Sequence, residues 1–312
     1  MGVSFWLFVT LSGPAWGGVP EPALPDGARV LARGGAGRAD AVDAAGGGAV
    51  LAAASLLPRY ELWTGVELGP SWGARVGALD SRTAGYALGA GYAGSTATHD
   101  PVPAHLPGWR VPGGTWVDET TRWHDVWVGL AVPFGSGASD AAATAPDGSP
   151  LPGPHRASLA LVGRWVRTDS SLAGAASGVT LDASGAWQPV PTLVLAAGAD
   201  NLLAREGTAG RRASLGVAWR PSLAFGVVAD GWAPWNESEA PDLEQAGGSL
   251  GLDAGAVEGG RVLLGGGWDG RPLVSGGAGI RGTSIDLDLG LRLHDPLGTR
   301  AWTSVTDLRL RF

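Results

Sequence analysis

Residues 283–294 read TSIDLDLGLRLH, and apolar and polar side chains alternate from Ser284 to His294. Apolar residues occupy the odd positions from Ile285 to Leu293, and polar or small residues occupy the even positions from Ser284 to His294. Because successive side chains of a β-strand point to opposite sides, a period of two predicts a strand with one apolar and one polar face. The end of the chain, VTDLRLRF at residues 305–312, repeats the pattern and finishes on an aromatic residue.

The same alternation continues from Arg59 to the C-terminus and predicts fourteen strands. Most of them are about 9–12 residues long, the length with which a tilted strand crosses a bilayer. Turn signals such as Asp269-Gly270 join several of them. The expected strands lie near 59–68, 72–80, 83–92, 120–134, 156–168, 177–187, 192–200, 212–220, 222–232, 248–257, 261–269, 271–281, 283–293 and 301–312.

Two closed all-β architectures fit such a set of strands. A soluble sandwich or barrel turns its apolar face inward, whereas a membrane barrel turns it outward to lipid and its polar face toward a lumen. The polar face here mixes small residues with few charges, which is sparser than the charged surface expected of a soluble protein. The residues predicted to face a lumen are Arg75, Asp125, Arg164, Asp182, Asp286, Asp288, Arg292 and Arg309.

The aromatic residues favour the membrane barrel. If the chain starts in the periplasm, aromatic residues on the apolar face gather at both ends of the strands, as in the two girdles of an outer-membrane barrel. The periplasmic set is Phe134, Trp187, Trp219 and Phe312, and the external set is Tyr92, Trp165, Trp268, Trp72 and Trp302. We therefore predict an all-β, transmembrane antiparallel barrel of about fourteen strands in a bacterial outer membrane.

The last strand also predicts a partner. Leu308, Leu310 and Phe312 lie on its apolar face, and a final strand that ends on an aromatic residue resembles the signal read by the outer-membrane assembly machinery. The same strand is expected to pair with the strand near 59–68, which would close the sheet and leave no free edge. The expected partners are thus the lipid bilayer and the assembly machinery.

Composition excludes several classes of function. The chain has 312 residues, a net charge of -7, no Cys and only Arg among its 22 Lys and Arg residues. The acidic balance argues against nucleic acid as a partner. The lack of Lys excludes a Walker A loop, and the lack of Cys excludes thiolate chemistry. We expect no cofactor and no metal site, since none of the five His residues shows metal-ligand spacing.

The sequence motifs that could indicate an enzyme have simpler interpretations. Two segments match G-x-G-x-x-G, at Gly89-Gly91-Gly94 and at Gly277-Gly279-Gly282, but both lie in alternating strands and no helix follows them. We interpret these glycines as small residues that make room inside the barrel. A Ser-His-Asp hydrolase in the wall would need His124 or His294, and no G-x-S-x-G element accompanies them. We predict that the protein is not an enzyme.

The first part of the chain differs from the barrel region. An apolar run at Val3–Leu11, followed by small residues around Ala15–Gly17, predicts a signal peptide at residues 1–17. Residues 18–57 are rich in Gly and Ala and only weakly periodic, and the barrel is assigned to residues 58–312.

Several stretches resemble FadL/PorV-like outer-membrane barrels, the superfamily of long-chain fatty-acid transporters. The first is DGARVLARGGAG at residues 26–37, followed by ADAVDA at 39–44. The others are VGLAVPF at 128–134, SGVTLDASGAWQPVPTLVLAAGADNLL at 177–203 and RRASLGVAWRPSLAFGVVAD at 211–230. The resemblance implies a fourteen-stranded barrel in which residues 18–57 fold inward as a plug, or hatch.

Two functions follow from this resemblance. In the first, the barrel is a porin-like protein for passive uptake of hydrophobic or amphipathic small molecules: Trp109 and Trp116 would capture the ligand, and movement of Gly34, Gly35, Ala36 and Gly37 would open a path. In the second, a PorV-like barrel without catalytic activity is a scaffold or carrier for a secretion or envelope complex. The sequence leaves both open.

Overall fold

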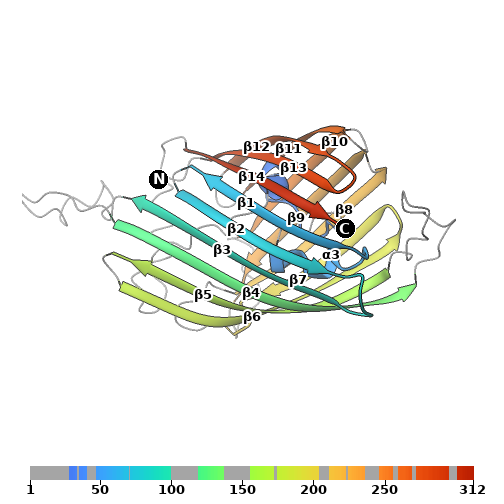
Figure 1. The fold of residues 1–312 in the computed structure, drawn as a ribbon, viewed down its shortest axis with the longest axis horizontal. Helices are drawn as coiled ribbons and strands as arrows, with labels where there is room; N and C mark the ends of the chain where they lie inside the picture. The colour runs from blue at the N-terminus through green and yellow to red at the C-terminus, as the bar shows by residue number, and fades with distance from the viewer. Residues whose placement is uncertain are drawn as a thin grey trace, which may run out of the picture.

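The computed structural model of the chain is a closed antiparallel β-barrel of fourteen strands (Figure 1). The structure describes residues 28–33, 35–40, 47–69, 71–99, 119–136, 155–171, 174–203, 211–222, 224–235, 246–255, 259–268, 272–294 and 301–312. Each strand pairs with its neighbours in sequence, and β1 (Tyr60–Leu68) pairs with β14 (Ala301–Arg311) to close the ring. This confirms the predicted fold class, the number of strands and the pairing of the first strand with the last.

The other strands follow the predicted ranges closely. In chain order they are β2 (Ser71–Asp80), β3 (Ala87–His99), β4 (Glu119–Ser136), β5 (His155–Ser170), β6 (Gly174–Val190), β7 (Leu193–Asp200), β8 (Arg212–Ser222), β9 (Phe225–Pro234), β10 (Gly247–Gly255), β11 (Gly259–Trp268), β12 (Pro272–Arg281) and β13 (Ile285–His294). Strands β4–β6 are the longest and extend beyond their neighbours at the ends.

The third strand differs most from its predicted range. It begins at Ala87, four residues after the predicted position 83, and it continues to His99. The reason is a turn nucleated by Asp80, whose side-chain Oδ1 accepts hydrogen bonds of 3.0 Å from the backbone N–H groups of Arg82 and Thr83. An Asp side chain that bonds the backbone two residues ahead stabilises a turn, and the strand can resume only after it.

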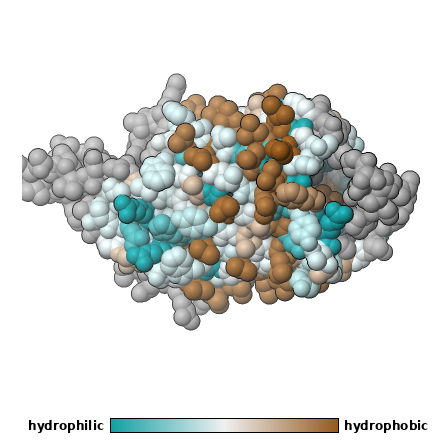
Figure 2. All heavy atoms as spheres, viewed as in Figure 1, coloured by the Kyte–Doolittle hydropathy of each residue, from teal (hydrophilic) through white to brown (hydrophobic). Residues whose placement is uncertain are grey.

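The apolar face of the sheet points outward. On β13, Leu289 is 42% exposed, whereas the adjacent Asp288 is completely buried. Figure 2 shows apolar residues gathered over the middle of the wall and hydrophilic residues nearer its ends. The aromatic residues predicted for the two girdles all have exposed side chains: Tyr92, Trp165, Trp268, Trp72 and Trp302 in one set, and Phe134, Trp187, Trp219 and Phe312 in the other. A soluble protein would bury this face, so the arrangement is that of a membrane barrel.

The final strand has the orientation expected of it. Leu308 and Phe312 are exposed on the outside, while Asp307 and Arg309 are buried on the inside. Leu310, on the same side as Leu308, is partly exposed. Recognition of these three apolar residues by an assembly machinery remains a prediction.

Parts of the N-terminal region lie inside the ring of strands (Figure 1). We call them the inner segment: residues 28–33 with α2 (Ala28–Ala32), residues 35–40, and residues 47–57 with η1 (Gly47–Val50) and α3 (Leu51–Ala54). None of the helices in the described part of the chain is long and apolar enough to cross a membrane. The predicted signal peptide lies outside the described residues, as do positions 18–27, 34 and 41–46 of the predicted plug.

The wall approaches the inner segment closely where its inward residues are glycines. A Cβ atom added to Gly277 on β12 would lie 2.7 Å from the Cβ of Ala32, and one added to Gly89 on β3 would lie 2.9 Å from the Cδ1 of Leu51. On β13, a Cβ at Gly290 would collide with the carbonyl oxygen of Ala28. These positions confirm that glycines of both G-x-G-x-x-G matches make room inside the barrel.

The closure between β1 and β14 can be tested by a disulfide, because the chain has no Cys of its own. Tyr60 and Phe312 exchange both backbone hydrogen bonds, at 3.1 and 3.4 Å, so alternation along the ladder makes Glu67 and Val305 a non-hydrogen-bonded pair. Their Cα atoms are then about 4.5 Å apart, within the range that a disulfide spans. We predict that Glu67→Cys with Val305→Cys cross-links on oxidation.

The cross-link joins positions near the two ends of the barrel sequence and makes the denatured chain circular. We expect a change in mobility on a denaturing gel that reductant reverses. The control pair, Glu67→Cys with Ser304→Cys, places the two thiols on opposite faces of the sheet and should not cross-link. Equal cross-linking of both pairs would contradict the register.

Candidate functional site

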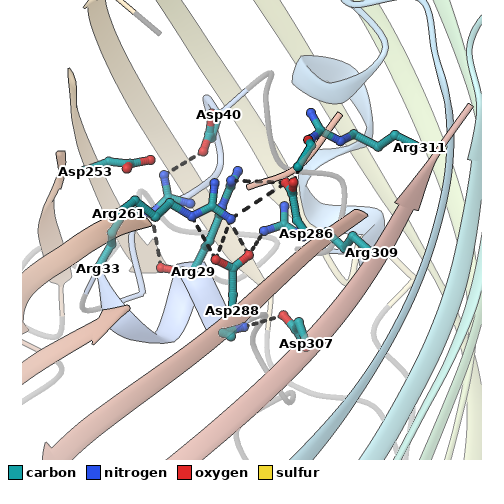
Figure 3. Close-up of polar contacts among 12 residues, drawn as sticks. Arg29, Arg33, Asp40, Asp253, Arg261, Asp286, Asp288, Asp307, Arg309 and Arg311 are labelled. Carbon is teal, nitrogen blue, oxygen red and sulfur yellow. Dashed lines mark hydrogen bonds and ion pairs between the residues drawn. The ribbon is translucent and has the colours of Figure 1, made fainter. Parts of the chain in front are cut away.

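A cluster of charged side chains joins the inner segment to strands β11–β14 (Figure 3). At its centre are Asp286 and Asp288, two residues apart on β13, which therefore point to the same side of the sheet. Both are buried inside the barrel. Isolated carboxylates are costly to bury, so their partners decide whether this arrangement is stable.

Arginines from three elements surround Asp288. Arg309 of the neighbouring β14 and Arg261 of β11 both form ion pairs with this carboxylate. Arg29 of α2 approaches it from inside the barrel, with its Nε 3.4 Å from the Oδ2 of Asp288. The carboxylate thus links the wall to the inner segment.

Asp286 makes a second set of contacts with arginines. Its nearest partner is Arg311, whose Nη2 donates a hydrogen bond of 2.6 Å to Oδ1. Arg29 and Arg261 lie farther away, with Nη2 atoms 3.6 and 3.7 Å from Oδ2. Four arginines therefore share these two aspartates.

A third wall carboxylate holds the start of α2. Asp307 on β14 accepts a hydrogen bond of 2.6 Å from the backbone N–H of Ala28 and forms an ion pair with Arg75 of β2. The first N–H groups of a helix have no partner within the helix, so the carboxylate satisfies a group that burial would otherwise penalise.

The next part of the inner segment is held by Asp40. Its Oδ2 lies 2.6 Å from Arg33 of the same segment and 2.9 Å from Arg220 of β8, which also contacts Asp253 of β10 at 3.3 Å. Burial by itself raises the pKa of the Asp40 carboxyl, but Arg220 and Arg33 outweigh it and hold the pKa well below the ordinary value. Asp40 is therefore a carboxylate at neutral pH.

Asp230 on β9 binds the backbone beside Asp40. Its Oδ2 accepts hydrogen bonds from the N–H groups of Gly37, at 2.7 Å, and Arg38, at 2.8 Å. The side chain of Arg38 in turn donates a hydrogen bond of 2.6 Å to Asp200 of β7. Residues 37–40 are thus attached to the wall through both backbone and side chains.

The other side of the interior is apolar. Leu51 and Leu56 of the inner segment are buried in a cluster that includes Trp63 of β1, Trp127 of β4 and Val162 of β5. The rings of Trp63 and Trp127 stack with their centroids 6.2 Å apart. Polar contact here includes the hydrogen bond of 2.7 Å between the hydroxyl groups of Ser55 and Ser158. The inner segment is therefore held by charges on one side and by apolar packing on the other.

The residues predicted to line a lumen all come from inward-facing positions. Three of them form a second group: Arg164 of β5 lies 2.7 Å from Asp125 of β4 and 3.5 Å from Asp182 of β6. Arg75 joins Asp307, and Asp286, Asp288 and Arg309 belong to the central cluster. Arg292 on β13 is half-buried, and its Nη2 would lie 3.5 Å from a Cβ placed on Gly35.

The residues predicted for gating and ligand capture are only partly described. Gly35, Ala36 and Gly37 belong to the inner segment, and Gly35 has a φ of 101°, a conformation that favours glycine. Gly34, Trp109 and Trp116 lie outside the described residues. Their roles remain predictions.

Sequence reasoning missed the inward-facing tryptophans and part of the charge cluster. Trp63 and Trp127 occupy positions that a polar face would fill with small or charged residues. For Trp127 the available signal was its two outward apolar neighbours, Val126 and Val128, whereas Trp63 has Thr64 on one side. Arg29, Arg33 and Asp40 lie in the weakly periodic segment, where no pattern assigns a direction. In the described parts of the chain, no group of three or more His, Asp or Glu side chains is arranged to hold a metal ion.

Comparison with known proteins adds information on the fold. No protein-family model matches the chain, and no curated protein matches its sequence. Among solved structures, the chain is similar to the CymD monoaromatic hydrocarbon channel, with a TM-score of 0.61 and 11% identity over 93% of this chain and 98% of that one. It is also similar to a deltaS2S3 mutant of the TodX monoaromatic hydrocarbon channel, with a TM-score of 0.59 and 11% identity over 93% and 98% of the two chains. At this identity the similarity shows a shared barrel fold.

The first prediction from the site concerns Asp288. Asp288→Asn removes the negative charge that three buried arginines share, and breaking a buried ion pair from one side costs about 3–5 kcal/mol. We expect the free energy of unfolding to fall by about this amount, measured by Trp fluorescence during urea unfolding in liposomes. Arg29→Gln leaves Asp288 paired with Arg261 and Arg309 and should cost less.

As a matched control, Asp169→Asn removes a carboxylate from the exposed ion pair with Arg167 on the outer face and should leave the unfolding curve unchanged. A larger loss for Arg29→Gln than for Asp288→Asn would contradict the assignment of Asp288 as the carboxylate that three arginines share.

The second prediction is a pH dependence that belongs to Asp40. Because its pKa in the folded protein is lowered, the carboxylate stabilises the fold above the ordinary Asp pKa, and this contribution is lost as the pH falls through the folded value. The difference in urea midpoint between the unmodified chain and Asp40→Asn should be constant above about pH 5 and shrink below about pH 4. A difference that grows on acidification would contradict the assignment.

Proposed function

We propose that the barrel lets hydrophobic or amphipathic small molecules cross the bacterial outer membrane passively, and that the inner segment controls the path. The observation that carries this proposal is the unequal attachment of the inner segment, ionic along α2 and residues 37–40 and apolar along η1 and α3. The passage would run along the apolar side, between α3 and the wall of β4–β6.

The physical argument compares what each side loses when it opens. Separating Arg29 from Asp286 and Asp288 would take the buried Arg29 guanidinium away from these two carboxylates, which is unfavourable. Separating Leu51 from Trp127 exposes only apolar surface, and an apolar molecule that enters the gap restores the lost contacts. Water in the same gap would not, so the apolar side favours hydrophobic molecules over ions and water.

The packing of the interior supports selective rather than open passage. Ala36, Leu51 and Leu56 of the inner segment are all buried against the wall. A molecule must displace this packing to pass. The gating role of Gly34–Gly37, the capture of ligand by Trp109 and Trp116, and the role of residues 18–57 as a plug belong to this proposal.

The fold comparisons support the proposal in general terms. The CymD and TodX structures are described as channels for monoaromatic hydrocarbons, which are small hydrophobic molecules. Under this proposal neither His124 nor His294 has a catalytic role, and His124 is engaged on the outer face in a hydrogen bond of 2.9 Å with the hydroxyl group of Tyr92.

A reversible lock tests the path. Ser55→Cys with Ser158→Cys replaces two hydroxyl groups 2.7 Å apart and should form a disulfide that ties the apolar side of the inner segment to β5. We expect the oxidised protein in liposomes to take up a labelled fatty acid or toluene at least tenfold more slowly than the reduced protein.

The matched control is the Glu67→Cys and Val305→Cys pair, which cross-links wall to wall and should leave uptake unchanged. Uptake that is insensitive to the lock would exclude a path along α3. No uptake by the unmodified chain would contradict the transport proposal and favour the scaffold or carrier function.

A further inference from the structure

The outer face of β4 and β5 carries a group of basic residues at one end of the barrel. Arg122 and His124 of β4 and Arg167 of β5 have the outward parity of the apolar residues Val126 and Val128. In the strand register His124 lies opposite Arg167, and Arg122 lies opposite Asp169. We call Arg122, His124 and Arg167 the basic patch.

The patch begins where the apolar band ends. The outward positions of β4 from Phe134 to Val126 are all apolar, and they extend about 26 Å along the strand at about 3.3 Å per residue. Because the strands of such a barrel are tilted by about 35–45°, this length corresponds to about 20 Å of height, which is most of the apolar band of about 25 Å. Trp165 and Tyr92 both pair with Val126 in the last apolar layer, and His124 is the next outward residue.

This position is the depth of the lipid headgroups. Aromatic residues mark the interface of a membrane barrel, and the side chains just beyond them meet phosphate groups and not acyl chains. Figure 2 shows a hydrophilic patch over the corresponding ends of β3–β5. The patch lies at the end that carries the external aromatic set.

The hydrogen bonds within the basic patch leave several of its side-chain nitrogens able to bind a further acceptor. Arg167 donates hydrogen bonds of 2.9 and 2.8 Å to the two carboxylate oxygens of Asp169 through Nε and Nη2, which leaves Nη1 for another acceptor. The hydrogen bond between the Tyr92 hydroxyl group and the Nδ1 of His124 leaves the Nε2 of His124 for another partner. Arg122 has an exposed side chain. Among the described side chains of this surface, one carboxylate, that of Asp169, thus faces Arg122, Arg167 and His124, on a chain whose net charge is -7.

We propose that the basic patch binds the phosphate groups of a phosphorylated lipid headgroup in the leaflet at this end of the barrel. Guanidinium groups bind phosphate through paired, charge-assisted hydrogen bonds, which suits Arg122 and the free edge of Arg167. The adjacent rings of Tyr92 and Trp165 would contact the upper part of the acyl chains. This surface is independent of what passes through the interior.

The test uses the full chain in detergent and diphosphoryl lipid A as the probe. Native mass spectrometry would measure the fraction of protein that retains lipid during a titration. One cationic side chain near an anionic headgroup changes affinity about fivefold, so Arg122→Gln with Arg167→Gln should weaken retention about 25-fold. Arg82→Gln, which removes an exposed arginine from the turn at the opposite end, is the matched control and should bind as the unmodified chain does.

Asp169→Asn provides the opposite test, because it removes the carboxylate that competes with phosphate for Arg167. It should raise lipid A affinity about fivefold, a gain that a loss of folding cannot mimic. Unchanged retention in the double Arg variant, or equal losses in that variant and in Arg82→Gln, would overturn the proposal. So would weaker binding by Asp169→Asn.

Discussion

The backbone hydrogen bonds of a sheet in lipid must all be made within the sheet, and the rest of this structure depends on that constraint. A bilayer has no water to satisfy an exposed strand edge, so a spanning sheet is stable only when it closes. Here the pairing of β1 with β14 supplies the closure. Closure leaves lipid outside the sheet and an interior inside it. The side chains of each strand must therefore alternate between apolar residues that face outward and polar or small residues that face inward, as Leu287 and Asp288 do on β13.

Closure also creates an interior that has to be filled, and the protein fills its two sides differently. Inward Asp and Arg side chains hold α2 and residues 37–40, while Trp63, Trp127 and Val162 pack against the region of α3. Apolar contacts are non-directional, whereas a buried ion pair that loses one partner is strongly destabilising. The two sides therefore differ in how easily they can separate, and this difference underlies the proposed path for small molecules.

The sequence predicted the strands of the barrel wall more accurately than the contacts inside the barrel. Period-two alternation was enough to find all fourteen strands, because every second side chain of each strand faces lipid and is therefore mostly apolar. It failed at the start of β3, where the Asp80 carboxylate accepts hydrogen bonds from the backbone N–H groups of Arg82 and Thr83 and holds these residues in a turn. It also assigned Arg75, Asp286 and Arg309 to the interior without indicating their partners, since Asp307 lies 232 residues from Arg75 in the chain.

What the sequence by itself determined is the direction of each wall side chain and hence the class of barrel. The physical reason is local: adjacent residues of a strand point to opposite sides whatever surrounds them. Only the tertiary structure decided which charges meet across strands, that two tryptophans stack inside the barrel, and how the inner segment is attached. These contacts depend on register and on the close approach of Gly277 and Gly290 to α2, which arise only when the sheet has closed around the N-terminal residues.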